Sequence, residues 1–138
     1  MAGMVVDASL AIAWVHPAQA SPSTDALLTD VGRGTPVIVP ALWFVEVANA
    51  LLALERRKKL RTEERLTALA ALRDLNISVD QEMSALAFTQ VSVLASELTL
   101  SVYDAVYLEL ALRLKMPLAC KDGPLREAAK RRRVKVLP

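Results

Sequence analysis

The chain has 138 residues, a length that fits a single domain (1–138) built around one hydrophobic core. Hydrophobic residues make up 54% and charged residues 23%, which excludes a disordered chain. Aromatic residues make up only 4%, so a base-stacking platform for single strands is not expected. The net charge is only +2, so any affinity for nucleic acid depends on where the cations gather.

Composition also restricts the metal chemistry and the location of the protein. The single cysteine, Cys120, excludes an internal disulfide and a zinc–thiolate cluster, and the single histidine, His16, excludes a histidine-rich metal site within one chain. No apolar run reaches the roughly 18 residues of a transmembrane helix, and no signal-type segment opens the chain. We therefore expect a cytoplasmic protein without a membrane partner.

Short apolar runs alternate with amphipathic segments along the chain. Proline, glycine and capping residues mark their borders, as in Ser21-Pro22-Ser23-Thr24 before one helix and Gly32-Arg33-Gly34 after it. The expected strands are 4–6, 36–40, 77–79, 118–120 and 134–136, and the expected helices are 9–15, 21–31, 41–58, 62–73, 83–98, 102–115 and 124–131. This alternation predicts an α/β fold, a three-layer α/β/α sandwich whose central, mostly parallel sheet has four to five short strands.

Four acidic residues stand where carboxylates are useful in such a fold. Asp7 and Asp122 each follow a short apolar strand, and ligands gather at the carboxyl ends of strands in open α/β sheets. Glu46 and Asp104 interrupt very apolar helices, where an unpaired carboxylate is costly to bury. A hard divalent cation lets several carboxylates converge without mutual repulsion. The four acids therefore predict a Mg²⁺ or Mn²⁺ site that cleaves phosphodiester bonds.

Three of these acids also have an ordinary structural explanation. Asp7 could cap the helix that follows it, Asp122 stands before Gly123-Pro124 as a turn residue, and Glu46 could pair with an arginine of a neighbouring helix. Asp104 is the hardest to explain in this way, because its helix is apolar on nearly every side. The occurrence of all four in this order favours the metal site.

Three blocks of sequence surround these acids: Val5-Val6-Asp7-Ala8-Ser9, Glu46-Val47-Ala48-Asn49, and Leu100-Ser101-Val102-Tyr103-Asp104-Ala105-Val106-Tyr107. In order and spacing they resemble the leading motifs of PIN-domain ribonucleases, and more narrowly those of the VapC toxins of bacterial and archaeal toxin–antitoxin pairs. The resemblance covers the whole chain.

This resemblance implies a metal-dependent endoribonuclease with RNA as its substrate, a small VapB-like antitoxin as its partner, and a homodimer. The acidic positions of the family match Asp7, Glu46, Asp104 and Asp122, which would bind Mg²⁺ or Mn²⁺, and its supporting polar positions match Ser9 and Asn49. Family members often have threonine where this chain has Cys120.

Other functions stay open. A processing nuclease of the same fold without an antitoxin is the nearest alternative, and a catalytically inactive RNA- or protein-binding module is another. An aspartate-based phosphotransfer or receiver domain also places an aspartate at a strand end. A phosphatase of that kind needs a second acid two positions later, where this chain has Ser9, and a receiver needs paired acids after its first strand, where only Asp7 stands.

Several other residues carry weaker signals. Two basic runs, Arg56-Arg57-Lys58-Lys59 and Lys130-Arg131-Arg132-Arg133, either suit negative helix ends or hold RNA phosphates, and we expect one or both to supply the salt-dependent part of RNA binding. Trp43 and Phe44 are adjacent and cannot both face one core, so one of them is a candidate for a partner surface. We expect His16 in a loop and Cys120 as a small buried hydrophobe.

Overall fold

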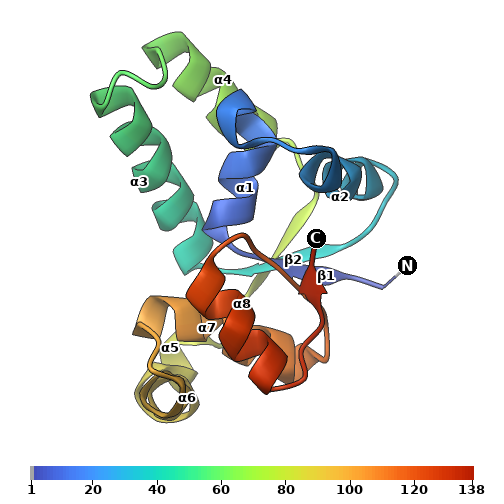
Figure 1. The fold of residues 1–138 in the computed structure, drawn as a ribbon, viewed down its shortest axis with the longest axis vertical. Helices are drawn as coiled ribbons and strands as arrows, with labels where there is room; N and C mark the ends of the chain where they lie inside the picture. Colours follow the sequence, from blue (N-terminus) through green and yellow to red (C-terminus); the bar gives the residue numbers. More distant parts are fainter. Residues whose placement is uncertain (1) are drawn as a thin grey trace.

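The computed structural model describes residues 2–138, which form a five-stranded sheet between two groups of helices (Figure 1). The strands are β1 (Met4–Val6), β2 (Val37–Pro40), β3 (Ile77–Asp80), β4 (Leu118–Ala119) and β5 (Val136–Leu137). Their order in the sheet is β3-β2-β1-β4-β5, and every neighbouring pair is parallel. The predicted α/β/α sandwich is confirmed.

Helices cover both faces of this sheet (Figure 1). On one side lie α1 (Ala8–Val15), α2 (Pro22–Gly32), α3 (Leu42–Arg56) and α4 (Thr62–Arg73), and on the other α5 (Met83–Leu86), α6 (Ser92–Leu98), α7 (Val102–Leu114) and α8 (Gly123–Arg131). A short 3₁₀ helix, η1 (Pro17–Gln19), follows α1, and a π-helical segment, η2 (Ala87–Val91), joins α5 to α6.

The core follows from this layering. Strands β1 and β4 are buried along their whole length, because a parallel sheet with helices on both faces leaves no side open to water. Trp43 of α3 and Tyr107 of α7 are among the largest fully buried side chains. The neighbour of Trp43, Phe44, is 46% exposed, which confirms that only one of these two aromatic residues faces the core.

Two boundaries differ from the sequence prediction for the same physical reason. The helix expected to reach residue 58 ends at Arg56, because Lys58 adopts left-handed backbone at φ 60°. The strand expected at 134–136 lies at Val136–Leu137, because Arg133 turns the chain out of α8 with φ 61°. The local sequence does not predict a left-handed residue at either position, because neither position is glycine, the residue that adopts this conformation most readily.

The helical stretch expected over 83–98 is continuous, but its middle is η2 and not α-helix. Within residues 2–138 no single helix is long and apolar enough to cross a membrane. Met83–Leu98 and Val102–Leu114 satisfy the length and composition of a span only as a pair, which is bent by 107° at the break between them.

Candidate active site

The sheet brings the four acids to its carboxyl edge. Strands β1 and β4 are direct neighbours, with Val5 paired to Leu118, so Asp7 and Asp122 both lie beyond the same end of the sheet. Glu46 lies in the second turn of α3, which starts directly after β2. Asp104 lies in the first turn of α7, and this helix packs across β1, β2 and β4.

Asp7 is the most buried of the four, with 4% of its surface exposed. Its carboxylate accepts hydrogen bonds from the Ser9 hydroxyl, at 2.7 and 2.9 Å, and from the Leu10 backbone N–H at 3.0 Å. Burial raises the pKa of Asp7 to about 7; these hydrogen bonds oppose the rise, and the charges of Asp122 and Asp104 add to it. Asp7 is therefore both the N-cap of α1 and a carboxyl group close to two others.

Ser9 joins the ends of the two central strands. While its hydroxyl donates to Asp7, the same oxygen accepts a hydrogen bond of 2.9 Å from the backbone N–H of Lys121, which precedes Asp122. Ser9 therefore lies between the Asp7 carboxylate and the backbone that leads to Asp122. Asn49 lies one turn beyond Glu46 on α3, and its side chain is exposed.

Glu46 has a different partner from the one considered from the sequence. The Tyr107 hydroxyl donates a hydrogen bond to its Oε1, and no arginine contacts Glu46 within residues 2–138, so an arginine pair is wrong. Burial raises the pKa of Glu46; the Tyr107 hydrogen bond opposes this shift, and the charge of Asp104 adds to it. Burial and the neighbouring carboxylates also raise the pKa of Tyr107, so its hydroxyl stays protonated.

Asp104 and Asp122 both sit at helix starts. The Ser101 hydroxyl caps α7 by accepting from the Asp104 backbone N–H at 3.0 Å. The Asp104 carboxylate is therefore not the cap of this helix. Asp122 caps α8 by accepting from the Leu125 N–H at 2.9 Å, so its ordinary explanation also holds. Burial and, after it, the charge of Asp122 raise the pKa of Asp104, while the Ser101 hydrogen bond opposes the shift.

The charges of these acids act on one another. Asp104 and Asp122 raise the pKa of Asp7, and Asp104 raises the pKa of Glu46, so Asp104 lies within electrostatic reach of all three. Among residues 2–138, however, no three carboxylate, thiolate or imidazole groups stand close enough together to hold one metal ion. The donors are the oxygen ligands that Mg²⁺ and Mn²⁺ prefer, and a cation would relieve the repulsion between them.

The two basic runs lie away from the acids. Arg56 is ten residues beyond Glu46 on α3, and Lys130 is eight residues beyond Asp122, so the two runs start about 12 to 15 Å along their helices from an acid at 1.5 Å per helical residue. In Figure 1, α3 and α8 run in opposite directions away from the sheet. Arg132 is also paired with Glu97 at 2.6 Å.

The lone cysteine and histidine are both buried. Cys120 is fully enclosed as predicted, and burial, followed by the charge of Asp7, raises the pKa of its thiol to about 12. His16 lies between α1 and η1, in a connection as predicted, but it is buried and its Nδ1 has no hydrogen-bond partner within residues 2–138.

A sequence profile described as the PIN domain matches residues 4–131. The chain belongs to the PIN-domain family. No match is found among curated protein sequences. The PIN fold is therefore established here by the profile and by the sheet order, and not by a close relative.

Solved structures share this PIN fold at low sequence identity. PAE2754 from Pyrobaculum aerophilum superposes with a TM-score of 0.72 at 20% identity, covering 98% of this chain and 83% of the other. VapC20 from Mycobacterium tuberculosis, described as a toxin that cleaves the sarcin–ricin loop, gives 0.65 at 18% identity with 91% and 95% covered. VapBC2 from Rickettsia felis, described as bound to a DNA fragment from its promoter, gives 0.66 at 9% identity with 96% of both chains covered.

Two residues of this PIN domain contact the acids or their backbone, although the sequence did not predict them as part of the site. Tyr107 is three residues after Asp104 and so shares its helix face, which was the available signal for a role beside the acids. Ser101 stands three residues before Asp104, the spacing of a helix N-cap. Both belong to the sequence block that resembled the PIN family.

Proposed function

We propose that this PIN domain is a metal-dependent endoribonuclease and the toxin of a toxin–antitoxin pair. The observation that carries the proposal is the gathering of Asp7, Glu46, Asp104 and Asp122 at one edge of the sheet, where the charges of Asp104 and Asp122 raise the pKa of their neighbours. Four half-buried or buried carboxylates at one edge of a sheet, three of them with a raised pKa, are unfavourable unless a cation joins them. A metal-dependent nuclease site would explain why these four carboxylates lie together.

In this proposal the four acids hold Mg²⁺ or Mn²⁺, with Asp7 as a direct ligand. When bound, the ion would lower the pKa of a water molecule and neutralise charge on the phosphoryl oxygens. Ser9 holds the Asp7 carboxylate and the Lys121 backbone together, which fixes the distance between the ends of β1 and β4. Asn49, exposed one turn after Glu46, faces water and is available to an RNA strand.

The direct test is cleavage of total RNA by the partner-free protein with Mg²⁺, with Mn²⁺ and with EDTA. We expect discrete products that disappear with EDTA and in the variants Asp7→Asn and Asp104→Asn. Asp74→Asn is the matched control, since Asp74 is exposed at the end of α4. Equal cleavage by the parent and both site variants, or none by the parent with either metal, would contradict the proposal.

An antitoxin is the proposed protein partner. Two of the structural neighbours are complexes named VapBC2 and FitAB, each described as bound to DNA. In this chain an apolar groove of about 480 Å³ runs between α3 and α4 and is lined by Trp43, Phe44, Val47, Leu66, Leu69, Ala70, Leu72, Arg73, Leu75 and Ile77. The indole N–H of Trp43 has no acceptor within residues 2–138. A partner segment with an apolar face would complement this groove.

Inhibition of RNA cleavage by an antitoxin distinguishes a toxin from a processing nuclease. Leu66 lines the groove and is 53% exposed. The Leu66→Lys variant should keep its RNA cleavage but escape inhibition by the antitoxin co-expressed with it. If no antitoxin-like protein suppresses cleavage by the parent, the processing-nuclease alternative is favoured.

A homodimer is the other proposed assembly. Phe88 on η2 is 97% exposed, and Val93 on α6 is exposed close to it, so this end of the molecule presents apolar side chains to water. We expect the protein to elute as a dimer and Phe88→Ser to elute as a monomer, as judged by light scattering. A monomeric parent would contradict the dimer without affecting the nuclease proposal.

A further inference from the structure

Tyr107 is placed to act on the acidic site and not only to fill the core. It lies one helical turn after Asp104 on α7, it is 2% exposed, and its hydroxyl donates to Oε1 of Glu46 on α3. The two residues are 61 positions apart in sequence, so this contact is made by the tertiary fold. Phenylalanine would fill the same space, because the core needs only the ring.

The hydrogen bond divides the two oxygens of Glu46 between two tasks. An ionised carboxylate only accepts hydrogen bonds, and a phenol is a neutral donor at physiological pH. Oε1 is therefore occupied by Tyr107, while Oε2 has no hydrogen-bond partner within residues 2–138. The charge of Asp104 acts on Glu46, and Asp104 lies one turn before Tyr107 on α7, so the Glu46 carboxylate belongs to the acidic cluster.

We infer that Tyr107 is a positioning residue that holds Glu46 by one oxygen and leaves the other as the single oxygen offered to the site. This inference rests on the proposed function. Glu46 then contributes one ligand, or orients one water molecule, and does not bind an ion with both oxygens. Partners that hold a metal ligand by hydrogen bonds commonly change metal affinity about 10- to 100-fold when they are removed.

The test measures Mn²⁺ binding by calorimetry for the parent, Tyr107→Phe, Glu46→Gln and the double variant. We expect Tyr107→Phe to weaken Mn²⁺ binding about 10-fold. In the Glu46→Gln background the same substitution should change the Kd less than about 2-fold, because its target is gone. Tyr103→Phe is the matched control, since Tyr103 is an exposed tyrosine on the same helix and should bind like the parent.

A steady-state assay on RNA supplies a second readout. Tyr107→Phe should lower kcat and leave KM for RNA unchanged, because the substrate strand does not contact a buried ring. Glu46→Asp shortens the side chain by one methylene and should also weaken Mn²⁺ binding. This variant alters the proposed ligand itself, so the comparison of Tyr107→Phe with and without Glu46 is the decisive one.

The possible results separate the inference from the proposed function. If the parent binds Mn²⁺ and cleaves RNA but Tyr107→Phe binds like the parent, Tyr107 is a core residue only and the inference is wrong. The inference is equally wrong if Tyr107→Phe has the same effect with and without Glu46. If the parent neither binds Mn²⁺ nor cleaves RNA, the proposed function itself fails.

Discussion

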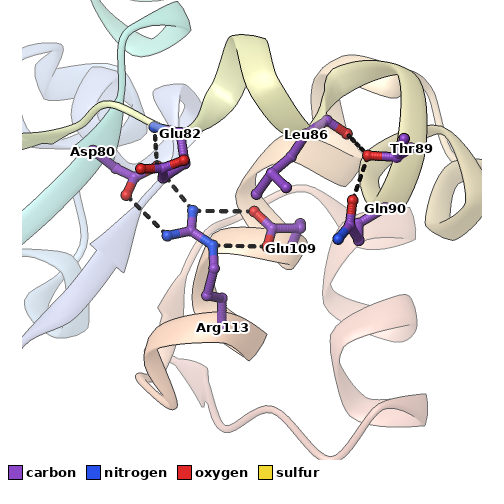
Figure 2. Close-up of polar contacts among 7 residues, drawn as sticks. All are labelled: Asp80, Glu82, Leu86, Thr89, Gln90, Glu109 and Arg113. Carbon is purple, nitrogen blue, oxygen red and sulfur yellow. Dashed lines mark hydrogen bonds and ion pairs between the residues drawn. The ribbon is translucent and has the colours of Figure 1, made fainter.

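Arg113 of α7 donates to both carboxylate oxygens of Asp80, at 3.1 and 2.8 Å, and so ties this helix to the last residue of strand β3 (Figure 2). The same guanidinium donates to both oxygens of Glu109, at 2.9 and 3.2 Å. Asp80 in turn accepts from the Glu82 backbone N–H at 3.1 Å. These contacts hold the helix that carries Asp104 and Tyr107 against the edge strand of the sheet.

Removing this arginine should lower the stability of the protein. Arg113→Met is expected to reduce the free energy of unfolding by about 1 to 2 kcal/mol, because two bidentate, charge-assisted pairs are removed and Asp80 and Glu109 are largely buried. Urea unfolding would measure this. Arg61→Met is the control: Arg61 and Glu64 form an exposed pair, and its removal should cost less than about 0.5 kcal/mol. Equal effects in both variants would show that the Arg113 contacts add nothing.

The metal-free protein should become less stable as pH rises. The folded-state pKa of Asp7 is about 7, above its ordinary value of 3.8, so folding favours the protonated acid. This contribution is fully present below about pH 4 and is lost as pH rises through about 7, on the order of a few kcal/mol in all. Thermal melting in EDTA between about pH 4.5 and 8.5 would follow this decrease in stability.

Asp7→Asn is the matched variant for this pH dependence. It keeps an oxygen that can accept from the Leu10 N–H, but it has no proton to lose, so its melting temperature should fall less with pH. Mn²⁺ should stabilise the parent more at about pH 8 than at about pH 5, because ligands bind as carboxylates. A parent and variant with parallel pH profiles would contradict the raised pKa.

Cys120 should be unreactive in the folded protein. Its thiol is buried, and a pKa of about 12 leaves almost no thiolate at about pH 8. We expect iodoacetamide to label it only after unfolding in urea, as measured by mass spectrometry. A Ser23→Cys variant provides an exposed thiol for comparison, and rapid labelling of Cys120 at the same rate would argue against its burial.

We predict that the two basic runs contribute to RNA binding and that an arginine outside them does not. Replacing Arg131, Arg132 and Arg133 with glutamine, and in a second variant Arg56 and Arg57, is expected to weaken RNA binding. The log–log slope of affinity against salt should flatten by about 0.7 for each RNA phosphate that is no longer neutralised. Fluorescence anisotropy in EDTA on an Asp7→Asn background avoids cleavage. Arg33→Gln, exposed after α2, is the control. Unchanged slopes in both multiple variants would exclude these runs from the RNA interface.

The sequence predicted the layers and the places of the acids because these depend on short-range patterns. Asp7 and Asp122 follow apolar strands, and parallel strands that neighbour each other bring such residues to one edge. The alternation of strands and helices was enough to predict the sandwich. The metal was predicted from the four acids and the RNA was implied by resemblance to PIN ribonucleases, and both remain proposals.

What the sequence could not predict depends on contacts between distant segments. The partner of Glu46 is a tyrosine 61 residues away, and no local pattern distinguishes that hydroxyl from an arginine. The early end of α3 depends on left-handed backbone at Lys58, a conformation that is uncommon for lysine. The burial of His16 likewise depends on tertiary packing. The residues around it predict only a loop, and a local pattern does not show which loop residues are buried.

Arg126 of α8 connects the end of the chain to the acidic site. Its guanidinium donates to the carbonyl oxygen of Cys120 at 2.8 Å, of Leu137 at 3.3 Å and of Pro138 at 3.2 Å. Strand β5 and the segment that leads to Asp122 therefore share one side chain. A change of backbone at residues 137 and 138 would therefore reach the segment that leads to Asp122 through this one guanidinium, although the two segments are far apart in sequence.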